Sequence, residues 1–356
     1  MALALSEISW QEPIVPIFAD EDWEREVKKK TGSVMDIMRR VAPSLWLRQV
    51  LLALGNPALV HITGNLAAMM SMVTAQENAC RYCYGATRAT MRILGYSEKR
   101  IGAIERGVQL ADFDERERTM LLFTRNLARS NPRPSRQDRE QLAALGFSSQ
   151  AIAEAAFFVA MGCFMNRVAT FMAVPLVLGF ERFANSVLGR VLGPLLARKL
   201  RIKPTSVTGH SPQSARFTAI VQGLAGLPAA NMVHNAIEGA FASTVLPVRL
   251  KTLMFAVVAR ALQCPFCEKE CRQLLARQGL SPEEIGSILS TLSDPELSPG
   301  EQRILAWTRN TVRYETEQIQ KSTRALGEEI GAERLLEAIG VASLANAAVR
   351  LAVILE

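Results

Sequence analysis

Residues 78–83 read NACRYC and residues 262–267 read LQCPFC, and these two stretches decide the fold because they reveal an internal repeat. A shift of 184 positions superimposes the two cysteines of the first stretch on those of the second. The same shift places Thr-Arg-Asn at 124–126 on Thr-Arg-Asn at 308–310 without a gap. Such spacing is hard to obtain by chance, so the sequence indicates two tandem copies of one unit.

Apolar residues before each cysteine pair recur at intervals of three and four positions. They are Leu66, Met69, Met70 and Val73 in the first copy, and Leu250, Leu253, Met254 and Val257 in the second. This period predicts core helices that lead into the cysteines. After each pair, a Gly-x-Ser element at 95–97 and 279–281 combines a helix stop with an N-cap, which predicts further helices over 98–109 and 282–292.

The composition favours helices over sheets. Hydrophobic residues make up 49% of the 356 residues, whereas the chain has only 4 Trp and 4 Tyr. We therefore expect an all-α fold made by tandem duplication of one helical unit. The expected organisation is an irregular lead-in at 1–30, a first unit at 31–197, a linker rich in Pro, Gly and Ser at 198–214, and a second unit at 215–356.

The formal charge of +7 is spread along the chain. The densest basic runs, at 28–30, 39–40 and 198–203, contain no interleaved aromatic residues, so we interpret them as solvated helix ends and expect no nucleic-acid partner. Residues 1–20 lack the pattern of a signal peptide, and the apolar stretch 168–180 is too short to span a bilayer. We expect a soluble cytoplasmic protein without an integral membrane segment.

The two Cys-x-x-Cys pairs indicate redox or metal chemistry rather than a disulfide framework. Residues three apart on a helix have Cα atoms about 5 Å apart, which is within disulfide range. Cys80 with Cys83, and Cys264 with Cys267, can therefore open and close a disulfide with little backbone movement. A position near a helix start also favours thiolate over thiol. Cys163 has no matching cysteine and is expected to fill the core.

The motif set resembles the alkylhydroperoxidase D / carboxymuconolactone decarboxylase family. Both Cys-x-x-Cys pairs, the Gly-x-Ser elements, the Thr-Arg-Asn helices and the Asn166-Arg167 helix carry the resemblance. It implies an all-α homo-oligomer without a cofactor, with peroxiredoxin-type antioxidant activity. By position, Cys83 and Cys267 would attack a hydroperoxide, Cys80 and Cys264 would resolve the sulfenic acid, and an external dithiol would supply electrons.

The sequence departs from that family in its proton relay. The relay positions hold Ala68, Tyr82 and Thr87 in the first copy, and Thr252, Phe266 and Cys271 in the second. Because general acid–base help is worth about a hundredfold to ten-thousandfold in rate, we expect slow peroxide turnover. Glu77 is a candidate substitute proton acceptor, and Cys271, four residues after Cys267, is a candidate alternative resolving thiol.

Three functions compete at this point. The leading hypothesis is a thiol–disulfide oxidoreductase or weak hydroperoxide reductase that acts on a hydroperoxide or another small molecule. The second is a thiolate site for zinc or copper(I), although Cys264 and Cys271 would lie about 10 Å apart along a continuous helix. The third is a non-catalytic assembly protein of the same fold. Nothing in the sequence clearly supplies the groups that a lactone decarboxylase needs, so that reaction ranks low.

Overall fold

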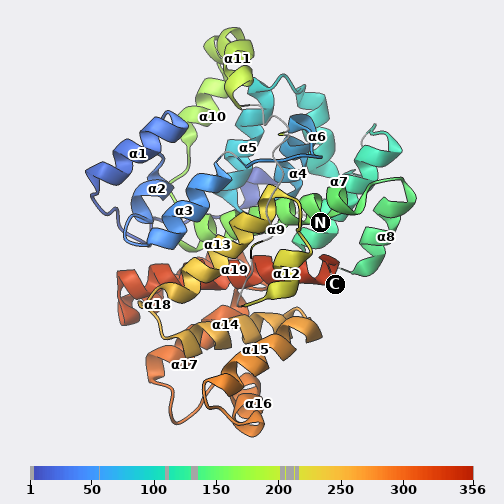
Figure 1. Cartoon of the computed structure of the whole chain (residues 1–356). Helices are drawn as coiled ribbons and strands as arrows, with labels where there is room; N and C mark the ends of the chain where they lie inside the picture. Colours follow the sequence, from blue (N-terminus) through green and yellow to red (C-terminus); the bar gives the residue numbers. More distant parts are fainter. Residues whose placement is uncertain are drawn as a thin grey trace.

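A computed structural model of the chain describes residues 4–55, 57–108, 112–129, 135–200, 205, 212 and 216–355 (Figure 1). Within these ranges the protein is all-helical, with nineteen α-helices, one short 3-10 helix and no strand. The sequence-based expectation of an all-α fold is confirmed for this part of the chain.

The helices fall into two runs along the chain. The first run comprises η1 (Leu5–Glu7), α1 (Glu21–Thr31), α2 (Asp36–Arg40), α3 (Leu45–Leu54), α4 (Gly64–Glu77), α5 (Arg81–Ile93), α6 (Glu98–Arg106), α7 (Glu115–Ala128), α8 (Arg136–Ala144), α9 (Ser149–Phe171), α10 (Leu178–Asn185) and α11 (Val187–Leu200). The second run comprises α12 (Thr218–Gln222), α13 (Pro228–Ala242), α14 (Val248–Ala261), α15 (Pro265–Arg277), α16 (Pro282–Thr291), α17 (Pro299–Asn310), α18 (Thr316–Ile330) and α19 (Ala332–Leu355).

Matching helices follow the spacing found in the sequence. Helices α14 and α15 begin and end 184 positions after α4 and α5. The turns before the cysteines match as well, because Ala79 and Gln263 both adopt a left-handed backbone, with φ of 46° and 52°. Gly95 and Gly279 also adopt positive φ, at 90° and 95°.

Local capping signals explain where these helices start and stop. The Ser97 and Ser281 side chains cap α6 and α16, and Ser281 forms the expected capping box with Glu284. Helix α6 ends earlier than predicted, at Arg106, because Gly107 takes a φ of 150° that does not continue a helix.

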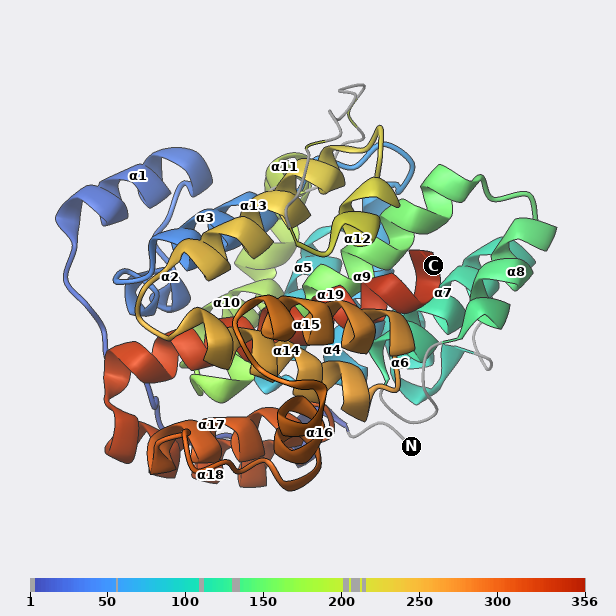
Figure 2. The same ribbon diagram turned by 60° about the horizontal axis from the view of Figure 1, so that its bottom comes forward.

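Two long helices, α9 and α19, pack against each other in the centre of the molecule (Figures 1 and 2). Both are long and apolar enough to cross a membrane by length and composition, but most of each lies buried inside the protein. That burial is typical of core helices. Two arginines at matched positions, Arg167 on α9 and Arg350 on α19, are fully buried here. Burial, reinforced by the positive charge of Arg167, lowers the pKa of Arg350 to about 9.

The two halves of the chain share one hydrophobic core. Residues from α4, α5 and α9 lie in the same buried cluster as residues from α14, α15 and α19. Helix α13 of the second half packs on α3 of the first (Figure 2), and α18 of the second half packs on α9 of the first. The halves therefore do not have separate cores, contrary to a simple picture of two domains joined by a linker.

Two details of the expected organisation need correction. The segment 1–30 is not wholly irregular, since 21–31 form α1, where Asp20 caps the helix and Trp23 and Val27 enter the core. Helix α11 runs to Leu200, so the expected linker at 198–214 begins inside a helix. Apart from 205 and 212, positions 201–214 lie outside the described residues.

Candidate thiol site

The first cysteine pair lies at the start of α5. Cys80 is the N-cap, and its sulfur accepts a hydrogen bond from the backbone N–H of Cys83 over 3.2 Å. The sequence interpretation had assumed that both cysteines lie on the helix. Cys80 instead immediately precedes the helix. Its side chain is fully buried, whereas Cys83 is partly exposed, and both are free thiols.

The second pair repeats this local geometry in a more enclosed setting. Cys264 caps α15, where Pro265 occupies the first turn, and its sulfur accepts from the N–H of Cys267 over 3.5 Å. Cys264, Cys267 and Cys271 are all buried, and none of them forms a disulfide. The structure thus places the cysteines predicted from the sequence in two separate groups. Cys83 in the first group is partly exposed, whereas the second group is buried.

Burial opposes ionisation of these thiols. It raises the pKa of Cys83 well above that of an ordinary thiol, and the neighbouring Cys80 sulfur adds to the effect. The contact with Cys264, followed by burial, raises the pKa of Cys267, and burial raises that of Cys271. The expectation that the helix start would favour thiolate is therefore wrong for Cys83 and Cys267, because desolvation and the neighbouring sulfur outweigh the helix-terminal field.

Cys83 lies on the wall of an apolar cavity of about 270 Å³. Helices α2, α3, α4, α5 and α9 form this cavity. Apolar side chains make up most of its wall, namely Met35, Met38, Leu51, Leu54, Phe157, Phe158, Met161 and Met165. The cavity has roughly the size and character of a site for a small apolar ligand.

Asn166 supplies an unused polar group on the same wall. This residue, on α9, is only 4% exposed and lines the cavity with Cys83. Its Nδ2 atom is buried and has no hydrogen-bond partner among the residues that the structure describes. An unsatisfied buried donor is costly in a native protein. The Asn166-Arg167 dipeptide was visible in the sequence, but nothing there indicated that Asn166 would line a cavity together with Cys83.

The relay positions in the first half of the chain do not supply the cavity with a proton carrier. Thr87 and Tyr82 line it, and the Tyr82 hydroxyl donates to Met35 Sδ over 3.9 Å. Burial raises the pKa of Tyr82 above its usual value, so this phenol holds its proton firmly. Ala68 has no ionisable group.

In the second copy, the relay positions are equally unsuited to proton transfer. Thr252 is buried, and its hydroxyl donates to the Val248 carbonyl one turn earlier. Phe266 is partly buried, and Cys271 is a buried thiol. None of the three carries a group that titrates near neutral pH.

Glu77 does not fit the proposed role of a substitute proton acceptor. Its carboxylate is largely buried and accepts from Arg125 Nε and Arg129 Nε, each over 2.8 Å. Two guanidinium partners hold it as a structural anion between α4 and α7. Both ion pairs would have to be disturbed before Glu77 could act as a proton acceptor.

A position on the cavity wall has an aromatic counterpart in the second half of the chain. Ser71 lines the cavity, and the residue 184 positions later is Phe255. Phe255 stacks on Phe217 with ring centroids 4.9 Å apart and contacts Phe241 at 5.5 Å. The Phe217 N–H donates to Glu270, the neighbour of Cys271. This cluster therefore lies next to α15, the helix of the second cysteine pair.

The segment before Cys80 is held by the other half of the chain. The Tyr314 hydroxyl donates to the Asn78 carbonyl over 3.0 Å, and the Thr316 hydroxyl donates to the Ala79 carbonyl over 2.9 Å. Arg167 Nη1 donates to Asn78 Oδ1 over 2.7 Å. Sequence reasoning missed Tyr314 and Thr316, because their partners lie more than 230 positions away.

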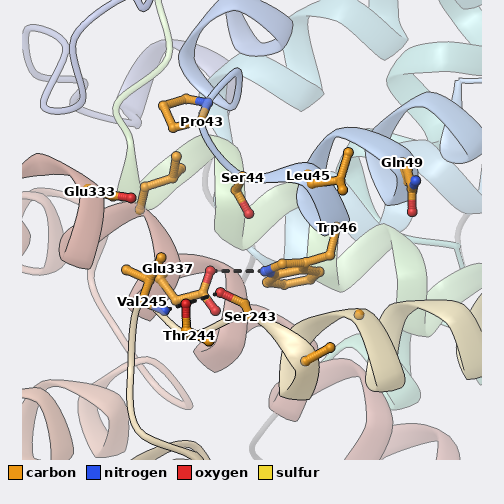
Figure 3. Close-up of a pocket in the computed structure, with 13 residues that line it drawn as sticks. Pro43, Ser44, Leu45, Trp46, Gln49, Ser243, Thr244, Val245, Glu333 and Glu337 are labelled. Carbon is orange, nitrogen blue, oxygen red and sulfur yellow. Dashed lines mark hydrogen bonds between the residues drawn. The ribbon is translucent and has the colours of Figure 1, made fainter.

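A second cavity, of about 380 Å³, lies where α3, α13 and α19 meet (Figure 3). The Glu337 carboxylate at its edge accepts from Trp46 Nε1 over 2.9 Å and lies 3.1 Å from Lys251 Nζ. Lys251 is fully buried and also donates to the carbonyls of Ala240 and Ser243, at the end of α13. This buried ion pair joins α14 and α19 of the second half, and the hydrogen bond from Trp46 connects it to α3 of the first half. It lies apart from the cysteines. A lone lysine in the apolar run at 248–258 was its only sequence signal.

The cysteines do not form an evident metal site. Across the described part of the chain, no group of three or more His, Cys, Asp or Glu side chains is placed to hold a metal ion.

Comparison with known proteins agrees with the fold and with the second cysteine pair. No curated protein and no solved structure gives a significant match to the chain. A family model matches residues 228–310, which span α13 to α17 and include Cys264 and Cys267, and no second copy is detected. Residues 228–310 are therefore similar to the carboxymuconolactone decarboxylase family.

Proposed function

We propose that this protein is a thiol–disulfide oxidoreductase that acts as a slow reductase of apolar hydroperoxides, with Cys83 as the attacking thiol and Cys80 as the resolving thiol. One observation carries the proposal: Cys83 is partly exposed on the wall of an apolar cavity, and Cys80 lies buried beside it. The Cys83 N–H to Cys80 sulfur contact of 3.2 Å supports close approach of the two side chains.

The proposed reaction balances with an external dithiol as the reductant. The Cys83 sulfur attacks the terminal oxygen of the hydroperoxide, the O–O bond breaks, and the alcohol leaves with a proton, which gives a sulfenic acid. The Cys80 thiol then attacks the Cys83 sulfur, and water leaves as the disulfide forms. The external dithiol reduces this disulfide in two exchange steps and is itself oxidised.

Two features support a low rate. The thiolate is the reactive form, and the raised pKa of Cys83 keeps that form scarce near neutral pH. The relay positions on the cavity wall, Tyr82 and Thr87, offer no group that accepts a proton in this range.

We also infer that the chain arose by tandem duplication. Support comes from the shift of 184 that relates the sequence motifs and from the identical shift of α4 and α5 onto α14 and α15. On this view the second pair has kept its cysteines while aromatic rings have filled its cavity. Cys267 would then react more slowly than Cys83, with Cys264 or Cys271 available to resolve it.

The register-matched cysteines give a matched test. Full-length protein, Cys83→Ser and Cys267→Ser are mixed with cumene hydroperoxide and a dithiol, and disulfides are mapped by mass spectrometry. We expect an 80–83 disulfide to form first, Cys83→Ser to lose most peroxide consumption, and Cys267→Ser to retain it. Equal consumption by Cys83→Ser and the unmodified protein would refute the assignment.

A further inference from the structure

Helix α11 shows an apolar face to solvent. Val187, Leu188, Val191 and Leu195 are 72%, 58%, 68% and 63% exposed. Their spacing places them along one side of the helix. Contiguous exposed apolar patches of this kind are uncommon on monomeric proteins and mark interaction surfaces. Figure 1 shows α11 at the top edge of the molecule, next to α10.

The opposite side of α11 is built from small residues. Gly189 lies so close to the preceding helix that a Cβ atom there would overlap the Phe183 carbonyl oxygen. A Cβ on Gly193 would lie 3.5 Å from the Ile93 carbonyl oxygen, and Leu196 packs on the small cluster around Ile93. The helix therefore packs on α5 and α10 through its small side and turns its large apolar residues outward.

The sequence around this helix has a single sign of charge. From 182 to 237 it contains seven Lys and Arg residues and no Asp or Glu. Arg198 is exposed in the last turn of α11, close along the chain to the apolar residues. The exposed side of α11 thus combines aliphatic side chains with the positive charge of Arg198.

We propose that α11 binds the surface of anionic lipid membranes, with its valine and leucine side chains entering the interface and the basic residues meeting the lipid headgroups. An amphipathic helix with basic residues is suited to this binding, because apolar burial and attraction to anionic lipid act together. A second copy of this chain is a poorer occupant, since its α11 region would bring the same positive charge. Nucleic acid is also a poorer occupant, because aliphatic side chains gain nothing from a phosphate backbone.

Membrane binding would bring the thiol site close to the lipid. Helix α11 packs on α5, which carries Cys83, and α10 is tied to α5 by an ion pair of 3.0 Å between Arg81 and Glu181. A bilayer is also a source of apolar hydroperoxides, the substrate class proposed above. Vesicle binding is measured without peroxide, so its outcome does not depend on the thiol chemistry.

The test is co-sedimentation of the full chain with vesicles of phosphatidylcholine alone or mixed with phosphatidylserine. We expect binding to the anionic vesicles that weakens as salt is raised, and much weaker binding to phosphatidylcholine. Val187→Ser/Val191→Ser/Leu195→Ser should lower the partition coefficient by more than about tenfold. Arg198→Glu should lower it by at least about fivefold. These residues are exposed, so the variants should fold normally.

Leu45→Ser is the matched control, because Leu45 is another exposed leucine, 68% accessible, on α3. It should bind as the unmodified protein does. Equal binding of the triple variant and the unmodified protein, or equal binding to both kinds of vesicle, would overturn the proposal. So would self-association in sedimentation velocity that the triple variant abolishes, since α11 would then be an interface between copies of the chain.

Discussion

Replacing Asn166 with leucine tests whether this side chain serves a ligand instead of the fold. Leucine is close to asparagine in size and shape but lacks the amide. Since Asn166 Nδ2 is buried without a partner among the described residues, the substitution removes an unsatisfied donor and breaks no hydrogen bond of that atom. We therefore expect Asn166→Leu to gain stability and lose activity.

The magnitudes follow from the two roles. An unsatisfied buried donor costs about 1–3 kcal/mol, so the variant should be more stable by up to that amount. If Nδ2 donates to an oxygen of the hydroperoxide during attack by Cys83, its loss removes one hydrogen bond worth about 0.5–1.5 kcal/mol. That corresponds to a fall in kcat/KM of about two- to tenfold.

Asn346→Leu on α19 is the matched control. Asn346 is also buried, but its amide donates to Thr311 Oγ1 over 3.0 Å and to the Ala342 carbonyl, and its Oδ1 accepts from Arg350. This variant should be destabilised by at least about 1–3 kcal/mol. Urea unfolding midpoints and cumene hydroperoxide kinetics give both quantities. If Asn166→Leu were destabilised as much as Asn346→Leu, Asn166 would be a bonded structural residue and the reasoning would fail.

Three further predictions use other parts of the structure. Ser71→Phe places in the first copy the ring that fills the second, so labelling of Cys83 by a bulky thiol reagent should slow at least about tenfold while stability falls by only about 1–3 kcal/mol; unchanged labelling would contradict this. Lys251→Met should cost about 3–5 kcal/mol because it leaves Glu337 buried and unpaired, and adding Glu337→Gln, which keeps an acceptor for the indole, should recover a large part of that loss in urea unfolding. The buried thiols have pKa values raised above those of the unfolded chain, so the folded state binds more protons at alkaline pH, and stability should fall as pH rises beyond about 8.5; Cys271→Ser should make that fall shallower.

The helices around the cysteines were predictable because their signals are local. Ser281 and Glu284 form a capping box three residues apart, and the glycines before Ser97 and Ser281 take the positive φ that their place at a helix end predicts. The register of 184 transfers these boundaries from one copy to the other without reference to tertiary structure. Periodicity in turn predicted that α4 and α14 are core helices, although α14 is buried on all sides from Leu250 to Ala259.

The parts that escaped prediction depend on contacts between distant segments. The bond from Tyr314 to the Asn78 carbonyl joins residues 236 apart, and the bond from Trp46 to Glu337 joins residues 291 apart. The role of Glu77 depends on its ion pairs with Arg125 and Arg129. The sequence around Glu77 gives no sign of these distant partners. Thiol ionisation was misjudged for the same reason, because a helix start is visible in sequence whereas the desolvation that raises the pKa of Cys83 is not.

The two cysteine pairs separate local geometry from chemical access. Cys80 and Cys264 have nearly the same backbone angles, with φ/ψ of −84°/95° and −96°/97°, and both sulfurs accept the N–H three residues on. The local sequence therefore suffices to build the motif twice. Access to the second cysteine of each pair depends on other parts of the chain. Methionines and leucines line a cavity beside Cys83, whereas Phe255, at the position that matches Ser71, packs against Phe217 and Phe241. Because the family match covers the buried pair, similarity to that family does not by itself assign a reactive thiol. Reactivity should follow the cavity, and the cavity belongs to the other half of the chain.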